Sequence, residues 1–169
     1  MLMIDLFAGS GGASQEMVNR GWEVFTVDID PRWNATVVGS ITEVTSWPTS
    51  LIDLLWASPP CTDFARESMP WCRTGIAPDI TLFREVHKLI DQLKPTWWVI
   101  ENVRGAIPYF GQWQYHAGPI YLWTNLPFLP RVVVRPFKSK LSSRRRAERA
   151  RTPAEISWAV ASAVESLAG

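Results

Sequence analysis

The chain has 169 residues, 47% of them hydrophobic, and a net charge of +1, a size that suits one domain with a single core over residues 1–169. No apolar run approaches the roughly 18 residues that a membrane span requires, and the N-terminus lacks the basic region and cleavage site of a signal peptide, so we expect a cytoplasmic protein without membrane contact. The two cysteines and two histidines follow no zinc or disulfide spacing, so we expect no metal.

The alternation of β-rich and helical stretches predicts an α/β fold with a mostly parallel sheet flanked by helices. The expected strands cover residues 1–7, 22–29, 51–58 and 96–103, and the expected helices cover residues 13–19, 80–93 and about 153–167. The helix over 80–93 has apolar residues at helical spacing and Pro95 beyond its end. Thr152 is the expected N-cap of the last helix, with Pro153 in its first position. Residues 65–79 show no clean period and predict a loop.

The first expected strand runs into a glycine-rich turn, in the segment DLFAGSGG over residues 5–12. A strand, such a turn and a following helix let backbone N–H groups approach a ligand closely. The glycines do not complete the G-x-G-x-x-G pattern of a dinucleotide oxidoreductase, because Ser14 occupies its last position. Asp28 ends the next strand, where a carboxylate can accept hydrogen bonds from both ribose hydroxyls, although it could equally be an ordinary turn aspartate.

Two further strands end in residues that suit covalent chemistry. Cys61 follows two prolines in ASPPCTDFA, and their restricted φ angles place the thiol on a rigid turn, as a nucleophile requires. In isolation, a free cysteine is more often a small buried hydrophobe. Glu101 lies in IENV at the end of the strand over 96–103, where ligand sites of open α/β sheets gather. The alternative is that Glu101 and Asn102 only cap the next segment.

Together, DLFAGSGG, the Pro-Pro-Cys turn and Glu-Asn-Val resemble the motifs of the DNA (cytosine-5) methyltransferase family. The resemblance implies a Rossmann-like methyltransferase fold and transfer of a methyl group from S-adenosyl-L-methionine to C5 of cytosine in DNA, leaving S-adenosyl-L-homocysteine. Cys61 would add to C6 of the ring, and Glu101 would assist by contacting N3 and the exocyclic amine.

The resemblance also implies the cofactor contacts, with Phe7 and Ile29 beside the adenine and Asp28 on the ribose. The third motif usually reads Gly-Asp-Ile, and here it is Gly39-Ser40-Ile41. The expected cofactor-binding residues are Asp5, Phe7, Ala8, Gly9, Gly11, Gly12, Asp28, Ile29, Ser40, Ile41, Pro59 and Leu82. The last expected helix resembles the final family motif, which completes the cofactor pocket.

A basic segment stands where a typical family member inserts a target-recognition domain, so the sequence resembles a minimal member without that domain. Nine of the seventeen Lys and Arg lie between Arg131 and Arg151, with Glu148 as the only acid, which favours contact with phosphates. The expected nucleic-acid contacts are Asn102, Arg131, Arg135, Lys138, Lys140, Arg144, Arg145 and Arg146. A solvated charged segment is the alternative.

The arginines that the family places after the Glu-Asn-Val motif are missing, since Gly118 and Ile120 stand there. His116, Arg131 or Arg135 could replace them, and the sequence selects none of the three. Two other functions stay open: the same chemistry on RNA or a free cytosine nucleotide, and an inactive relative that binds S-adenosylmethionine or DNA. A homodimer or a helper protein would enlarge the DNA-binding face, and a nucleoid-associated location would be consistent with such a substrate.

Overall fold

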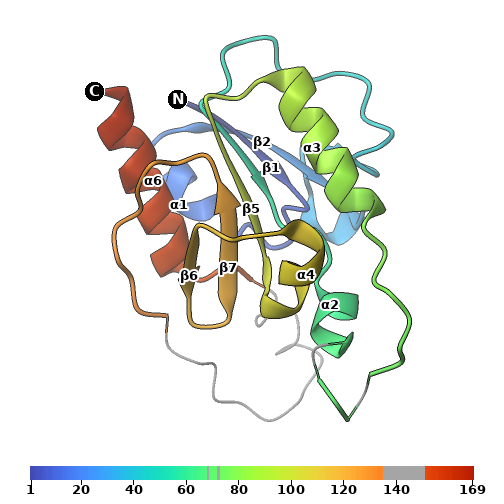
Figure 1. The fold of residues 1–169 in the computed structure, drawn as a ribbon. Helices are drawn as coiled ribbons and strands as arrows, with labels where there is room; N and C mark the ends of the chain where they lie inside the picture. The colour runs from blue at the N-terminus through green and yellow to red at the C-terminus, as the bar shows by residue number, and fades with distance from the viewer. Residues whose placement is uncertain (68, 72, 135–150) are drawn as a thin grey trace.

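The structure, a computed structural model, describes residues 1–67, 69–71, 73–134 and 151–169. In this part of the chain, seven strands form one sheet in the order β3-β2-β1-β4-β5-β7-β6 (Figure 1). The strands are β1 (Leu2–Leu6), β2 (Glu23–Asp28), β3 (Val37–Val38), β4 (Leu54–Ala57), β5 (Trp97–Val103), β6 (Tyr115–Ala117) and β7 (Ile120–Thr124). The helices are α1 (Gln15–Asn19), α2 (Thr62–Glu67), α3 (Thr81–Leu93), α4 (Ile107–Phe110) and α6 (Ala154–Ala168), with 3₁₀ turns at Pro31–Trp33 and Arg104–Ala106.

The predicted mostly parallel, Rossmann-like sheet is confirmed. Strands β3, β2, β1, β4 and β5 pair in parallel, and only β7 runs antiparallel to its neighbours β5 and β6 among the described strands. Every residue of β1 and β4 is buried, as expected of central parallel strands covered on both faces. The sequence interpretation did not identify β3, β6 or β7.

The order of the strands across the sheet reverses at β1: the chain adds β2 and β3 on one side of β1, and then β4 and β5 on the other side. Ligands of open α/β sheets bind outside the carboxyl ends of the strands at such a switch point. The turn after β1 and the turn after β4 therefore meet at one edge of the sheet. These are the two segments that hold the glycine-rich motif and Cys61.

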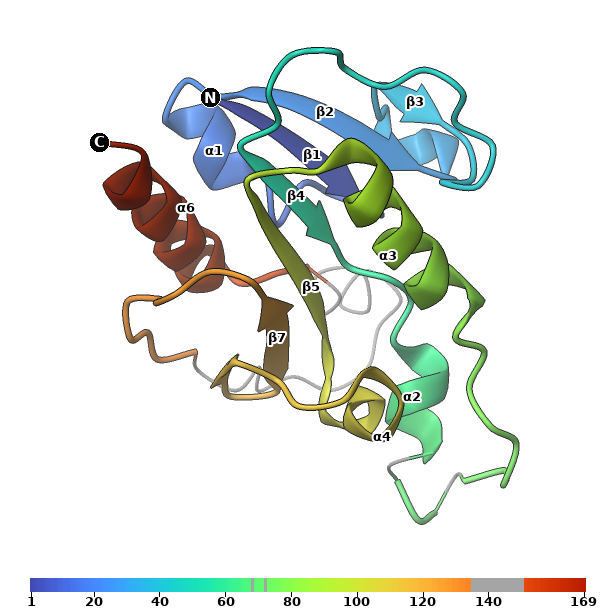
Figure 2. The ribbon, with the colours of Figure 1, turned by 45° about the horizontal axis from the view of Figure 1, so that its top comes forward.

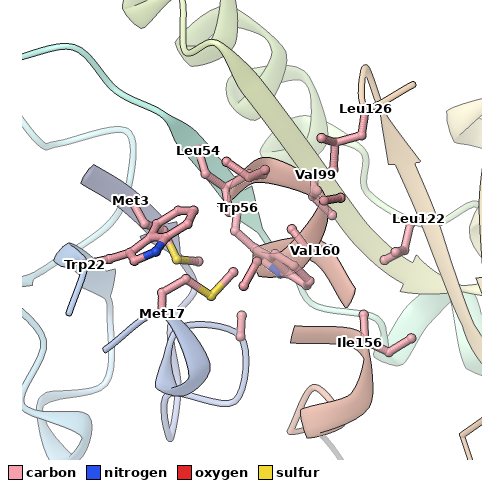
Figure 3. Packing of buried hydrophobic residues seen from close by; sticks show 14 of the residues in the cluster. Met3, Met17, Trp22, Leu54, Trp56, Val99, Leu122, Leu126, Ile156 and Val160 are labelled. Carbon is pink, nitrogen blue, oxygen red and sulfur yellow. The ribbon is translucent and has the colours of Figure 1, made fainter. Parts of the chain in front are cut away.

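Helices cover both faces of the sheet (Figure 2), with α1 and α6 on one side and α3 on the other. Side chains from α1, α6 and the sheet form one core cluster, in which Met17, Trp56 and Val160 are fully buried (Figure 3). A second cluster fills the opposite face, under α3 and α4. None of the helices in the described ranges is long and apolar enough to cross a membrane.

Helix α6 is joined to the N-terminal part of the chain by polar contacts as well as by the core. The buried hydroxyl of Ser157 donates a hydrogen bond to the carbonyl of Ala13. Glu165 accepts from the Arg20 guanidinium at 2.6 Å and from the Trp22 indole at 3.0 Å. The bond of Ser157 fixes the start of α6 beside the segment that follows the turn after β1, and the bonds of Glu165 fix the end of α6 beside the end of α1.

Several predicted boundaries differ from the structure. The expected N-cap at Thr152 is wrong: Pro153 holds the cap position with extended backbone, no side chain caps the helix, and α6 begins at Ala154. The first helix begins at Gln15 rather than at residue 13. The expected loop over 65–79 overlaps the end of α2, because the helix that starts after Cys61 continues to Glu67.

Candidate active site

A cavity of about 310 Å³ opens at the carboxyl ends of the central strands. Its volume lies at the lower end of the range typical of small-molecule sites, roughly 300–1,000 Å³. Most of its wall comes from the turn after β1, the turn after β4 with the end of β5, and the segment that precedes α6, and Trp33 and Ile120 complete it. The lining residues are Asp5, Phe7, Ala8, Gly9, Ser10, Gly12, Ala13, Trp33, Ser58, Pro59, Pro60, Cys61, Thr62, Glu101, Val103, Ile120, Arg151 and Thr152.

The turn after β1 is shaped by left-handed backbone. Gly9 and Gly11 have φ angles of 51° and 74°, which glycine adopts without steric cost. Phe7 also has a positive φ, 64°. Left-handed backbone is strained in a residue other than glycine, and such residues are found most often at functional sites. The carbonyl of Val27 accepts hydrogen bonds from the amides of Phe7 and Ala8, at 2.9 and 3.1 Å. Strand β2 therefore holds the turn in its strained form.

Asp28 supports the same turn from the end of β2. Its carboxylate accepts hydrogen bonds from the amide of Gly9 at 2.7 Å and from the amide of Asp30 at 2.8 Å. Asp28 does not itself line the cavity, but the bond to Gly9 ties the end of β2 to the cavity wall.

Asp5 is a buried acid with an unpaired oxygen. The residue is 1% exposed, and its Oδ2 atom has no hydrogen-bond partner among the residues that the structure describes. Burial raises the Asp5 pKa to about 7, the charge of Asp28 adds to the rise, and a hydrogen bond from Ser14 opposes it. An unpaired buried acceptor is costly for the free protein. A ligand with a cationic donor group would satisfy it.

Cys61 and Glu101 lie close enough in the cavity to act on each other electrostatically. Burial raises the pKa of the Cys61 thiol, and the charge of Glu101 raises it further. Burial also raises the pKa of Glu101, to about 7, against hydrogen bonds from Ser58 and Thr152. Near neutral pH the cavity therefore holds a thiol beside a carboxyl group that can be protonated, which is a pair suited to nucleophilic addition with acid assistance.

Asn102, expected to contact nucleic acid, lies in the protein interior instead. Its residue is 1% exposed. The amide nitrogen donates to the carbonyl of Pro59 at 3.0 Å, and the amide oxygen accepts from the amide of Val103 at 2.9 Å. Both ends of the side chain are thus occupied by backbone, and Asn102 positions the turn that carries Cys61.

The other expected cofactor residues divide into two groups. Asp5, Phe7, Ala8, Gly9, Gly12 and Pro59 line the cavity, and Gly11 lines a neighbouring hollow that shares Ala8, Gly9, Ser10 and Trp33 with it. Four lie away from the cavity wall: Ile29 is 74% exposed, Ser40 bonds the Thr42 hydroxyl, Ile41 is buried in the core, and Leu82 packs against that core. The sequence interpretation missed Trp33 and Arg151 as lining residues.

Of the expected basic contacts, only Arg131 is described by the structure. It is exposed and lines a separate cavity of about 370 Å³ beside β6 and α6. His116 lines that second cavity and stacks on Tyr121, away from Cys61. The predictions for Arg135, Lys138, Lys140, Arg144, Arg145 and Arg146 lie outside the described residues.

The strand order defines a Rossmann-like α/β protein, and its cavity lies at the carboxyl ends of the parallel strands, where open sheets of this kind bind ligands. The family model for C-5 cytosine-specific DNA methylase matches residues 1–108, a span that includes the glycine-rich turn, Cys61 and Glu101. The chain belongs to this family. No curated protein matches it.

Several solved methyltransferase structures are similar to part of this chain. A putative DNA modification methyltransferase encoded within an E. coli prophage has 22% identity and a TM-score of 0.48 over 63% of this chain and 33% of its own. The Dnmt2 methyltransferase of S. pombe has 18% identity and a TM-score of 0.40 over 63% of this chain and 35% of its own. This chain thus spans about a third of the length of either structure. A glycopeptide N-methyltransferase, MtfA, solved with S-adenosyl-L-methionine, has 12% identity and a TM-score of 0.37 over 80% of this chain and 64% of its own.

Proposed function

We propose that the chain transfers a methyl group from S-adenosyl-L-methionine to C5 of cytosine in DNA, through a covalent bond between Cys61 and C6 of the ring. The observation that carries the proposal is the presence of Cys61 and Glu101 in one cavity with the glycine-rich turn. A nucleophile, an acid and a cofactor-binding turn are the three parts that this reaction needs, and they come from three distant stretches of the chain.

The proposed chemistry starts from the weakness of cytosine C5 as a nucleophile. Addition of the Cys61 sulfur to C6 forms a carbon–sulfur bond and moves electron density to C5. Glu101 in its protonated form donates to N3 of the ring and offsets the negative charge that the addition creates. After C5 has accepted the methyl group, the C5 proton passes to water, the C5–C6 double bond forms again, and the C6–sulfur bond breaks to release Cys61 as the thiolate.

The residues present fit the proposed cofactor. When bound, S-adenosyl-L-methionine supplies an electrophilic methyl group on a sulfonium. The turn of Gly9 and Gly11 allows close approach of a ligand to the backbone, and the unpaired Oδ2 of Asp5 is an acceptor for the ammonium of the cofactor. Asp28, Ile29, Ser40, Ile41 and Leu82 remain proposed cofactor contacts from the family resemblance.

DNA is the substrate that we propose, on the basis of the family and of the basic segment over residues 131–151. Phosphates neutralised by Lys and Arg release counterions, so affinity should fall with salt in proportion to the number of contacts. We propose that Arg131, Arg135, Lys138, Lys140 and the run Arg144 to Arg146 make such contacts. Neutralising the run Arg144 to Arg146 should flatten the dependence of DNA affinity on salt, and an unchanged slope would exclude those three arginines.

The test is transfer of a labelled methyl group from S-adenosyl-L-methionine into duplex DNA of mixed sequence. Native protein should transfer label and Cys61→Ala should transfer none, whereas Cys72→Ala, which also removes one thiol, should retain activity. RNA and free deoxycytidine triphosphate are assayed in parallel. Label in either of them but not in DNA would overturn the proposed substrate, and equal labelling by native protein and Cys61→Ala would overturn the proposed nucleophile.

A further inference from the structure

The Glu101 carboxyl group has a hydroxyl partner from the neighbouring strand. Strands β4 and β5 pair in parallel, with Trp56 beside Val99, so Ser58 and Glu101, each two residues further along, also stand side by side. Side chains two residues apart on a strand point to the same face of a sheet. Trp56 and Val99 lie in the core cluster on the face that carries α6. Ser58 and Glu101 continue this row into the cavity, which both of them line.

A buried tryptophan holds the hydroxyl group of Ser58. Trp56 is fully buried in the core cluster between the sheet and α6 (Figure 3). Its Nε1–H group donates to the Ser58 Oγ atom at 3.0 Å. An indole nitrogen is only a donor, so this bond uses a lone pair of the Ser58 oxygen and leaves the hydroxyl hydrogen for another acceptor. The amide of Ser58 also donates to the carbonyl of Leu6 at 3.2 Å, so its backbone and side chain are both held.

The acceptor for the Ser58 hydrogen is the Glu101 carboxyl group. This bond favours the ionised form and lowers the pKa of Glu101 against the larger rise that burial causes, and the hydroxyl of Thr152 acts in the same direction. Among the described residues, the other ionisable side chains that line the cavity are those of Asp5, Cys61 and Arg151. Ser58 therefore connects the rigid core to an acid that lies in a cavity with other ionisable groups.

We infer that Ser58 is a positioning residue: held by Trp56, its hydroxyl fixes the orientation of the Glu101 carboxyl group in the cavity. The inference rests on the proposed function, in which Glu101 donates to N3 of cytosine. A carbonyl oxygen is a better acceptor than the hydroxyl oxygen of a carboxylic acid, so in neutral Glu101 the proton lies on the oxygen that Ser58 does not hold. The bond thus determines which oxygen of Glu101 donates to the ring.

Titration of Glu101 in the free protein tests the bond without any reaction. Protein labelled with ¹³C at the side-chain carboxyl groups of glutamate is titrated by NMR, and Glu101→Gln identifies the Glu101 signal by its loss. Ser58→Ala should raise the pKa of Glu101 by roughly 1, because a hydrogen bond to a charged group is stronger than one to a neutral group. Ser58→Thr keeps the hydroxyl and should titrate like native protein. The matched control is Ser50→Ala, in the exposed loop before β4, which should also titrate like native protein.

A double variant separates this role from simple support of the core. Ser58→Ala alone leaves the buried indole N–H of Trp56 without its acceptor and should lower the melting temperature. Trp56→Phe combined with Ser58→Ala removes the donor and the acceptor together, and the pKa of Glu101 should stay as high as in Ser58→Ala. Thermal unfolding checks that each variant is folded. A native pKa of Glu101 in Ser58→Ala, or a return to the native pKa in the double variant, would overturn the inference.

Methyl transfer into duplex DNA measures the consequence for the reaction. Ser58→Ala should lower kcat about 10- to 100-fold, and Ser58→Thr should recover most of the loss. Because Ser58 acts through Glu101, adding Ser58→Ala to Glu101→Gln should cause no further loss of kcat. An unchanged kcat in Ser58→Ala, or a full further loss in the Glu101→Gln background, would contradict the inference and leave the proposed function intact. If native protein transfers no methyl group, the proposed function fails, whereas the titration still decides whether Ser58 holds Glu101.

Discussion

Replacing Gly12 by alanine should destabilise the protein, because the segment before α6 packs directly on this glycine. The added methyl group would lie 2.4 Å from Arg151 Cγ, 2.7 Å from the Thr152 amide nitrogen and 3.0 Å from the Thr152 carbonyl oxygen. The arginine stem can rotate away, but the Thr152 backbone can move only with the start of α6. Overpacking of this kind costs about 1–3 kcal/mol, and each kcal/mol lowers the melting temperature of a protein of this size by about 2–4 °C.

Urea denaturation followed by tryptophan fluorescence measures the effect on the free energy of unfolding. Gly39→Ala is the control, because a Cβ at Gly39 meets no atom within 4 Å and the residue has no left-handed backbone. That substitution should leave the free energy of unfolding unchanged or raise it by about 0.4–1 kcal/mol, because alanine lowers the conformational entropy of the unfolded chain. Equal stability of Gly12→Ala and Gly39→Ala would show that α6 does not approach the turn as closely as the structure indicates.

Three further substitutions test the electrostatics and support of the cavity. Glu101→Gln removes a charge that raises the pKa of the Cys61 thiol. Alkylation of Cys61 by iodoacetamide, followed by peptide mass spectrometry, should therefore begin at lower pH in this variant than in native protein. An unchanged pH profile would refute the electrostatic effect of Glu101 on Cys61. Asn102→Ala leaves the carbonyl of Pro59 without its donor and should cost about 1–3 kcal/mol in urea denaturation, whereas a cost near zero would argue against its positioning role. Burial raises the pKa of Asp5 to about 7, so the Asp5 carboxyl group holds its proton more tightly in the folded protein than in the unfolded chain. The resulting stabilisation of the fold is full below about pH 4 and is lost as the pH rises through 7. Asp5→Asn should therefore lose less unfolding free energy between pH 4 and pH 8 than native protein does, and equal losses would contradict the raised pKa.

The central strands could be predicted from the sequence because each is an apolar run bounded by turn residues. The segment LMIDL is buried throughout, and its composition alone indicates a central strand of a parallel sheet. The β6–β7 hairpin could not be recognised in the same way, since β6 has three residues and His116 in it is exposed. Its available signal was the two-residue connection Gly118-Pro119, where Gly118 has a φ of 59°; glycine at the first position of such a loop is typical of a hairpin turn.

Residues of the site could be predicted where the chemistry of the side chain indicates its function. They could not be predicted where the function depends on whether the side chain is buried. Cys61 and Glu101 were selected because a thiol and an acid at strand ends suit covalent chemistry, and the structure brings them into one cavity. Asn102 follows Glu101 in the same motif, and the sequence does not show that the two side chains point in opposite directions. Alternation along β5 settles this: Glu101 faces the cavity, and Asn102 is turned inward onto Pro59.

Arg151 shows a different limit, because its place in the cavity wall depends on packing between the N-terminal and C-terminal parts of the chain. In the sequence it is one of nine basic residues in the segment that we propose to contact phosphates, and nothing local separates it from the others. The separation comes from α6: the bonds from Ser157 to Ala13 and from Arg20 and Trp22 to Glu165 dock the helix beside α1. That docking brings Arg151 and Thr152 onto Gly12. Because the cavity wall and the docking of α6 are linked in this way, a ligand that contacts this wall of the cavity should also stabilise α6 against local unfolding.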